Sequence, residues 1–325
     1  MTMTDSIGGG PSVSGVAKPM SRLALGTAFY RLAQKEQGFS LLDRFRELGG
    51  TTIDSAHGYG ESEKVVGQWL ASRKASEQML LITKCAHGNA ILPEEGFEQN
   101  VDEEVAQSHQ DLGVELIDLL FLHRDNPVVP VERIMTKLSD VVRSGHARAI
   151  GASNWSYDRI DAANAWAAKN GGVPFVAVSN NLSLGRAAEP FYPNLVSTDA
   201  AGEAWHKRMG LPLIPWSSQA RGFFTGRWPR EMRDNPGAGS DAFTARMIAV
   251  YATEANYGRL ERAEALGRDK GGFSAMQVAL AWVAARPFPI VPVVGPHTVE
   301  ELESCLRALS LALTPTECRW LDLGE

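Results

Sequence analysis

Residues 49–70 read GGTTIDSAHGYGESEKVVGQWL, which is a short strand, a polar loop and an amphipathic helix in that order. Residues 51–53 are largely β-branched and too few for a helix, whereas the apolar side chains of residues 63–72 recur at steps of three and four. A strand followed by such a helix is the repeating unit of parallel α/β folds. This stretch therefore indicates the fold class, with a polar loop at the carboxyl end of a strand.

The same strand-and-helix unit recurs along the chain from residue 22 onward. Further amphipathic segments lie at residues 39–48, 101–112, 131–144 and 159–169, between short apolar runs. We predict strands at residues 23–25, 51–53, 80–83, 116–122, 147–150, 175–178, 213–215 and 290–294. Eight such units predict an α/β fold of the closed (β/α)8 TIM barrel type, in which the active site lies at the C-terminal ends of the strands.

The chain is predicted to form one domain. Residues 1–20 are rich in Ser, Gly and Pro, so we expect a flexible, poorly ordered lead-in before a single barrel over residues 21–325. No Pro/Ser-rich linker divides the barrel. Residues 222–257 break the regular pattern after the seventh strand, which predicts a long functional loop there.

Composition and charge argue against several kinds of partner. The 325 residues are 44% apolar without an apolar run of the roughly 20 residues that span a bilayer, so no membrane partner is expected. A net charge of -6 argues against nucleic acid. Three cysteines without CxxC spacing indicate a reducing compartment, and the lack of a secretory signal makes the cytoplasm the expected location. The oligomeric state stays open.

A doubly wound dinucleotide-binding fold is the main structural alternative, because it also alternates strands and helices. Its Gly-rich turn needs three glycines or small residues at fixed spacing. The nearest candidates, Gly58 and Gly60, are not followed by a third glycine or small residue at that spacing. The sequence therefore favours the barrel.

Four proton-handling side chains follow three neighbouring strands. Asp54 and Tyr59 follow the second strand, and Lys84 and His123 follow the third and fourth. Tyrosine is a weak acid with a pKa of about 10, which a nearby lysine cation would lower. A buried lysine keeps its charge beside an acidic partner, which Asp54 supplies. His123 would orient a carbonyl oxygen or assist proton delivery.

Five segments of the chain, between about residues 22 and 323, resemble the aldo-keto reductase family. They are GGTTIDSAHGYGESEKVVGQWL, LLITK, IDLLFLHRD, GHARAIGASNW and PWSSQARGFFTG. The resemblance implies a (β/α)8 barrel, NADPH as the usual cofactor and reversible reduction of aldehydes or ketones to alcohols. It also implies that Asp54, Tyr59, Lys84 and His123 are catalytic, with Tyr59 as proton donor and no metal. The partner would be a small-molecule carbonyl or alcohol.

The resemblance also assigns residues to cofactor binding. It implies that Ser153 and Asn154 contact the nicotinamide carboxamide and that Trp216 stacks on the nicotinamide ring. Ser179 stands where the family usually has Gln. The other residues that it implies are Ser217, Gln219, Arg221 and Gly222 in a pyrophosphate loop, and Gly295, His297 and Glu301 beside the adenosine.

Glu301 bears on the choice of cofactor. It stands where the resemblance predicts Gln or Arg, and a carboxylate would repel a 2'-phosphate but accept a hydrogen bond from a free ribose hydroxyl. NADPH remains the expected cofactor on the family resemblance, with NADH as the alternative.

Tyr30, Arg124 and Trp155 are predicted to border the substrate. Their mixture of flat apolar surface and hydrogen-bonding groups suits a sugar or polyol carbonyl, which we state as a hypothesis.

Two other functions stay open. A cofactor-binding sensor or interaction subunit with little turnover would share the fold, although the intact catalytic set argues against it. A metal-dependent hydrolase is the third class, although the sequence holds no HxH or HExxH arrangement. Its ligands would come from Asp54, His57, His87, His123 and Asp125.

Overall fold

Parallel strands form one sheet at the centre of the computed structural model, which describes residues 7–87, 92–234 and 241–325. Among these residues the strand order is β6-β5-β4-β3-β2-β1-β7. The strands are β1 (Ala24–Gly26), β2 (Thr52–Asp54), β3 (Leu80–Cys85), β4 (Ile117–Leu122), β5 (Ala147–Ser153), β6 (Phe175–Ser179) and β7 (Val293–Val294).

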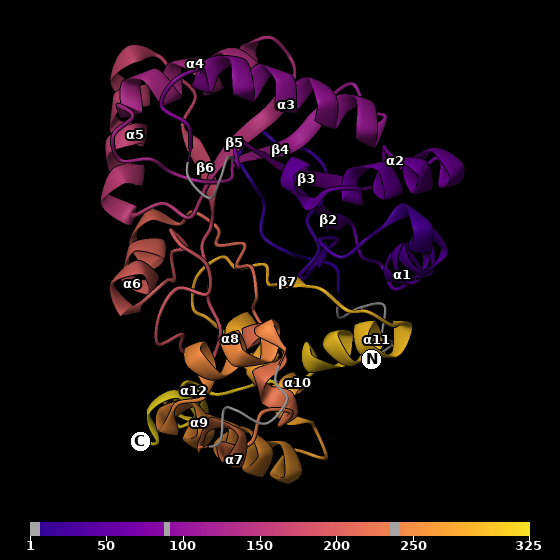
Figure 1. The fold of residues 1–325 in the computed structure, drawn as a ribbon, viewed down its shortest axis with the longest axis vertical. Coiled ribbons are helices and arrows are strands. Elements are labelled where there is room, and N and C mark those ends of the chain that lie inside the picture. Colours follow the sequence, from indigo (N-terminus) through magenta and orange to yellow (C-terminus); the bar gives the residue numbers. More distant parts are fainter. Residues whose placement is uncertain (1–6, 88–91, 235–240) are drawn as a thin grey trace.

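Helices surround these strands, with α1 and α2 on one side and α5 and α6 on the opposite side (Figure 1). The α-helices are α1 (Lys35–Glu47), α2 (Ser62–Arg73), α3 (Phe97–Leu112), α4 (Val131–Arg143), α5 (Tyr157–Asn170), α6 (Ala200–Met209), α7 (Arg230–Asp234), α8 (Ala242–Tyr251), α9 (Glu254–Asp269), α10 (Ala275–Ala284), α11 (Val299–Ala308) and α12 (Pro315–Leu323). The 3-10 helices are η2 (Leu32–Gln34), η3 (His57–Tyr59) and η4 (Ala220–Thr225).

The barrel closes between β6 and β7 through single bridges rather than through a ladder. Leu213 forms parallel bridges with Val178 of β6 and with Ile290. The Leu213 N–H donates to the Pro289 carbonyl, and the Leu213 carbonyl accepts from the Val291 N–H, both at 2.9 Å. The predicted strand at residues 213–215 is therefore a bridge, and the predicted strand at 290–294 is reduced to its last residues. Proline explains the difference, because residues 212, 215, 289 and 292 have no N–H to donate.

Apolar side chains from the strands fill the barrel interior. Phe121 of β4 lies against Gly151 of β5, where an added Cβ would meet the Phe121 ring at 2.4 Å. The cluster also contains Leu80, Ile82, Leu119, Ala149, Ala177, Ile214 and Val291. The interior is thus a packed core that holds the strand ends in place.

The N-terminal segment packs against the same core. Val13 and Met20 are buried in the interior cluster, and Ile7 is fully buried beside β1. The Lys18 ammonium group donates to the Ser76 and Met79 carbonyls and lies 2.8 Å from the Asp118 carboxylate. The expectation of a poorly ordered lead-in therefore does not hold for residues 7–20, and residues 1–6 lie outside the described part.

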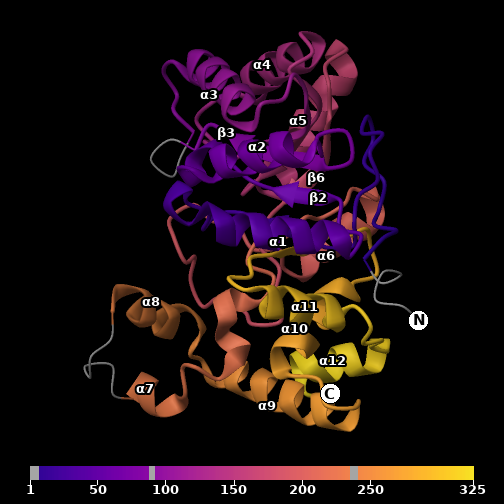
Figure 2. The ribbon, with the colours of Figure 1, turned by 90° about the vertical axis from the view of Figure 1, so that its right-hand side faces the viewer.

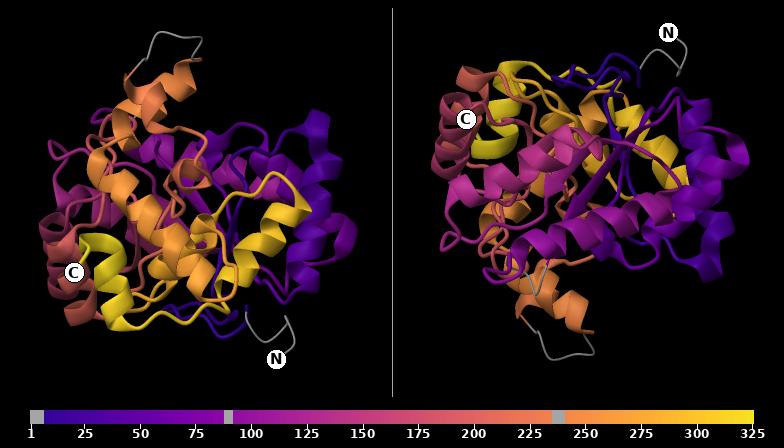
Figure 3. Two further views of the ribbon diagram at one scale, coloured as in Figure 1. Left: turned by 90° about the horizontal axis from the view of Figure 1, so that it is seen from below. Right: turned by 90° about the horizontal axis from the view of Figure 1, so that it is seen from above.

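Residues 222–257 differ from the predicted loop, because much of the segment is helical. It contains the end of η4, all of α7 and α8 and the start of α9. Figures 2 and 3 show α7 and α8 standing out from the barrel, on the opposite face from the N-terminal segment. None of the described helices is long and apolar enough to cross a membrane.

Candidate active site

Lys84 and Asp54 form a buried ion pair at the end of β3 and β2. The Lys84 ammonium group lies 2.7 and 2.8 Å from the two carboxylate oxygens and also donates to the Ser55 carbonyl at 2.8 Å. Burial alone would lower the pKa of Lys84, but Asp54 and Tyr59 raise it above its usual value. The lysine therefore stays charged inside the barrel mouth.

Tyr59 lies directly over this ion pair. It ends η3, a turn that follows β2, and the Lys84 nitrogen is 5.1 Å from the centre of its ring. Burial raises the pKa of Tyr59 more than the Lys84 cation lowers it. The sequence-based expectation of a lowered pKa is thus wrong for the net shift, although Lys84 does favour the phenolate as expected.

His123 completes the group from the end of β4. Its ring is edge-on to Tyr59, with centroids 5.7 Å apart, and its N–H on the main chain donates to the Cys85 carbonyl at 2.8 Å. Burial and then the charges of Lys84, His87 and Arg124 hold the pKa of His123 well below its usual value. The imidazole is therefore neutral near pH 7 and carries one ring N–H.

Arg124 follows His123 and is also buried, with 5% of its surface exposed. Its Nη2 lies 3.2 Å from Nε2 of His87, whose ring centre is 4.7 Å from that of His123. Arg124 thus lies beside the candidate catalytic residues, and its contact with the substrate stays a prediction.

The other two predicted substrate residues lie in the core. The Tyr30 ring packs against α1 and α2, with a Cβ placed on Gly38 meeting it at 3.1 Å. Trp155 is fully buried against Phe175 and under the Arg159 guanidinium. Both residues are buried in the apolar clusters, and their contact with the substrate stays a prediction.

Trp216 follows the Leu213 bridge and begins the predicted pyrophosphate loop. The Asn181 amide donates to the Trp216 carbonyl at 2.8 Å, whereas the Trp216 Nε1 is buried without a hydrogen-bond partner among the described residues. Ser217, Ala220 and Arg221 have φ of 50°, 47° and 52°. Left-handed backbone at three non-glycine residues is strained, and such strain gathers at functional sites.

Arg221 and its neighbours complete this loop. The Arg221 guanidinium stacks on Phe191 at 4.2 Å, and its Nε is buried without a partner in the described ranges. Gly222 has a φ of 90°, which glycine adopts without strain. The Gln219 side-chain amide donates to the Cys305 sulfur at 3.4 Å.

Ser153, Asn154 and Ser179 lie side by side at the ends of β5 and β6. The Ser153 hydroxyl donates to the Ser179 carbonyl, and the Asn154 amide donates to Ser153 Oγ and to the His123 carbonyl. The Ser179 hydroxyl donates to the Ile214 carbonyl at 2.9 Å. The donors of these three side chains already bind protein acceptors, so only their acceptor lone pairs remain for a ligand.

The predicted adenosine-binding residues meet at the start of α11. Thr298 caps this helix, and the Glu301 carboxylate accepts from the His297 N–H at 2.7 Å. The His297 ring lies 4.9 Å from that of Phe29, and Gly295 is also near Phe29. Glu301 thus has a local structural partner at a helix start that carries acidic side chains.

The comparison with protein families agrees with this geometry. The aldo/keto reductase family model matches residues 22–322. The chain belongs to the aldo/keto reductase family.

Curated relatives in this family align over most of both chains. Versiconal hemiacetal acetate reductase of Aspergillus parasiticus is 29% identical over 89% of this chain and 86% of its own length. Norsolorinic acid reductase B of Dothistroma septosporum is 28% identical over 91% of this chain and 74% of its own length. The chain is therefore an oxidoreductase of the aldo/keto reductase type.

A solved aldo-keto reductase structure shows the same fold. A thermostable member crystallised with the inhibitor epalrestat has a TM-score of 0.69 and covers 96% of this chain and 98% of its own. Its sequence identity of 19% supports the fold alone.

The residues of this aldo/keto reductase fit a nicotinamide dinucleotide. In the described ranges, Trp216 Nε1 and Arg221 Nε are buried donors without protein partners. Trp216 would hold the nicotinamide ring, and Arg221 would hold the pyrophosphate.

Metal ligation has no support in the described ranges. No group of three or more His, Cys, Asp or Glu there could hold a metal ion. Asp54 is paired with Lys84, and Asp125 accepts two hydrogen bonds from Arg159.

Sequence reasoning missed one buried carboxyl group behind the site. Glu63 of α2 accepts from Thr83 at 2.5 Å and from Ser108 of α3 at 3.0 Å, and burial raises its pKa. Glu63 thereby ties both helices to the strand that carries Lys84. Helical spacing alone placed it on an amphipathic face, and nothing in that pattern marked it as buried.

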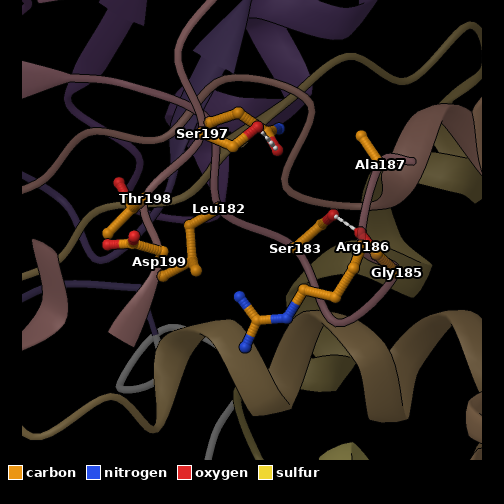
Figure 4. Close-up of a pocket in the computed structure, with 9 residues that line it drawn as sticks. Leu182, Ser183, Gly185, Arg186, Ala187, Ser197, Thr198 and Asp199 are labelled. Carbon is orange, nitrogen blue, oxygen red and sulfur yellow. Dashed lines mark hydrogen bonds between the residues drawn. The ribbon is translucent and has the colours of Figure 1, made fainter. Parts of the chain in front are cut away.

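A separate cavity lies between the loop after β6 and the start of α6 (Figure 4). Arg186 lines this cavity, and its guanidinium lies 2.8 Å from the Asp322 carboxylate. The charge of Arg186 is thus already compensated by Asp322. Ser183, which also lines the cavity, donates its hydroxyl to the Gly185 carbonyl at 2.6 Å.

Proposed function

We propose that this aldo/keto reductase reduces an aldehyde or ketone to an alcohol, with Tyr59 as the proton donor and NADPH or NADH as the cofactor. The observation that carries the proposal is that the Lys84 nitrogen, paired with Asp54, lies 5.1 Å from the centre of the Tyr59 ring, with the His123 ring edge-on to it. A bound nicotinamide cofactor supplies the hydride to the carbonyl carbon.

Tyr59 gives its proton to the carbonyl oxygen as the carbon–oxygen double bond becomes a single bond. Lys84 stabilises the phenolate that remains, because a cation beside an oxyanion favours it electrostatically. Asp54 keeps Lys84 protonated and in place. Proton donation by a positioned side chain contributes about 10²–10⁴-fold to a rate.

His123 positions the substrate oxygen. Its pKa lies well below the usual value, so at neutral pH it is an uncharged hydrogen-bond donor rather than a proton source. The assignment leaves Tyr59 as the acid of the group.

The cofactor assignment rests on the family and on Glu301. Aldo/keto reductases imply NADPH, which we retain, while the exposed carboxylate of Glu301 at the start of α11 favours NADH. Relatives are named both as reductases and as aryl-alcohol dehydrogenases, so their names support interconversion of a carbonyl compound and an alcohol without giving its direction.

The sugar or polyol carbonyl stays a hypothesis, and two of the residues that suggested it, Tyr30 and Trp155, are buried in the apolar clusters. Arg124 is the predicted substrate residue that lies beside the catalytic group.

Cofactor titration and a Tyr59→Phe variant test the proposal together. Trp216 fluorescence should respond to NADPH or NADH, and Tyr59→Phe should lower kcat for aldehyde reduction about 10²–10⁴-fold. The variant should bind cofactor like the wild type, because the hydroxyl does not hold it. Tyr192→Phe is the matched control, since Tyr192 is 51% exposed and keeps its ring.

The outcomes separate the alternatives. Cofactor binding without turnover in the wild type would favour a sensor or interaction subunit. Equal rates for Tyr59→Phe and wild type would remove Tyr59 as the acid, and binding of neither cofactor would overturn the proposal.

A further inference from the structure

Arg124 carries a buried positive charge beside the catalytic group. In the part of the chain that the structure describes, its Nε and Nη1 have no hydrogen-bond partner, and its Nη2 faces His87. Burial lowers the pKa of the Arg124 guanidinium, and its charge is close enough to Tyr59 to affect the phenol. Uncompensated buried cations are strongly destabilising, so proteins retain them where they bind something.

The neighbouring carboxylates do not compensate this charge. Asp125 is the next residue, and it accepts two hydrogen bonds from Arg159 Nε at 2.9 and 2.7 Å. Asp54 is held by Lys84 on both of its oxygens. The described ion pairs at this end of the barrel therefore leave Arg124 without an acidic partner.

The position of Arg124 favours an anion on the substrate. His87 fixes one end of the guanidinium, and His87 itself packs on His123, which faces Tyr59. A guanidinium has two edges that match the two oxygens of a carboxylate. Nη2 has a second N–H besides the one that faces His87, so it can serve one carboxylate together with either Nε or Nη1, which both lack a partner among the described residues.

We propose that the natural substrate is an oxo acid, a carbonyl compound that also bears a carboxylate, and that Arg124 binds this carboxylate while Tyr59 and His123 hold the carbonyl oxygen. This inference rests on the proposed carbonyl reduction and adds the charge of the substrate to it.

The test compares each carboxybenzaldehyde isomer, ortho, meta and para, with the matching carbamoylbenzaldehyde. The amide has nearly the same shape as the carboxylate and lacks its charge. For at least one isomer, kcat/KM for the acid should exceed that for the amide about 10- to 100-fold, as expected for a charged hydrogen bond. Most of the difference should lie in KM.

Variants then assign the preference to one side chain. Arg124→Gln should bring the acid-to-amide ratio close to one, and Arg124→Lys should restore part of it. Arg227→Gln removes an exposed positive charge after η4 and should keep the wild-type ratio, which excludes general electrostatic attraction.

Binding without turnover keeps the two proposals apart. Calorimetry with hydroxymethylbenzoate and hydroxymethylbenzamide in the presence of reduced cofactor, a combination that cannot react, should show the same preference for the acid. Reduction of the amides without any preference for the acids would overturn the oxo-acid inference and leave carbonyl reduction standing. Absence of reduction for every aldehyde would count against carbonyl reduction, and equal binding of acid and amide would still reject the role of Arg124.

Discussion

The imidazole of His206 stacks on the Phe288 ring, with centroids 5.2 Å apart and planes inclined by 17°. His206 is fully buried, and its Nδ1 lies 2.7 Å from the Leu211 carbonyl. Burial lowers the pKa of His206 to about 4. This histidine at the end of α6 is therefore neutral in the folded protein across the pH range in which an unfolded histidine titrates.

Acid should destabilise the protein through His206. The unfolded histidine has a pKa of about 6.5, so between pH 6.5 and 4 the unfolded chain binds the extra proton. The contribution is fully present above pH 6.5 and is lost as pH falls toward 4, with an upper bound of about 3 kcal/mol. Urea unfolding at pH 7 and 4.5 should show a smaller pH effect for His206→Gln than for wild type. An equal loss of stability between pH 7 and 4.5 in His206→Gln and wild type would contradict this prediction. His297→Gln, at an exposed site, serves as the control.

Breaking the Lys84–Asp54 pair from one side should cost more than removing both charges. Lys84→Met leaves a buried carboxylate without its partner and should lower the free energy of unfolding by about 3–5 kcal/mol. The double variant Lys84→Met with Asp54→Asn should lose less. Denaturant unfolding of the wild type and the three variants measures this cycle, and additive losses would reject the coupling.

The pH dependence of catalysis should follow the shifts at Tyr59 and His123. The pKa of Tyr59 is raised above 10 and that of His123 is well below 6.5. Reduction should therefore keep its kcat/KM between about pH 6.5 and 10, because Tyr59 stays protonated and His123 stays neutral. Alcohol oxidation needs the phenolate and should rise with pH over the same range. A reduction rate that falls with an apparent pKa near 8 would contradict this assignment.

Glu301 should influence the choice of cofactor. Glu301→Gln removes a negative charge at the start of α11 and should raise affinity for NADPH relative to NADH. Glu317→Gln is the matched control, because Glu317 caps α12 in the same way at the other end of the sequence. The ratio of the two dissociation constants, measured by fluorescence titration, should change for Glu301→Gln alone. If the ratio of the two dissociation constants changes equally in both variants, the effect belongs to helix capping rather than to the position of Glu301.

Lys18 should stabilise the barrel from its amino end. Its ammonium group bonds to two carbonyls and to the buried Asp118, so Lys18→Met should lower the free energy of unfolding by about 1–3 kcal/mol. Lys35→Met is the control, since Lys35 makes an exposed contact of 3.4 Å to Gln68. If the two variants are equally stable by denaturant unfolding, residues 7–20 lie on the barrel without supporting it.

The sequence predicted that the candidate catalytic residues meet because of a general property of parallel sheets. Carboxyl ends of neighbouring strands meet at one edge, so Asp54, Lys84 and His123 had to converge once the strands were recognised. Tyr30 and Trp155 lie in the loops after β1 and β5, where the strand pattern does not indicate which way a side chain points. Their contact with the substrate therefore stays a prediction.

The structure differs from two other expectations, one because of backbone chemistry and one because isolated apolar residues show no pattern. Residues 213–215 have the composition of a strand, but Pro212 and Pro215 remove the donors that a ladder needs. The Ser, Gly and Pro content of residues 1–20 is typical of disorder, and isolated apolar residues such as Val13 and Met20 gave no period to reveal their burial. The pairing of Lys18 with Asp118, 100 positions away, has no local signal.

The closure of the barrel through β7 has a consequence for synthesis on the ribosome. β1 pairs with β2 early in the chain, but its other neighbour is Val293–Val294. Until those residues leave the exit tunnel, the growing chain holds an open sheet whose two edge strands, β1 and β6, expose unpaired backbone groups. The barrel therefore cannot close before Val293–Val294 has been made, and exposed strand edges of this kind favour aggregation in the unfinished chain.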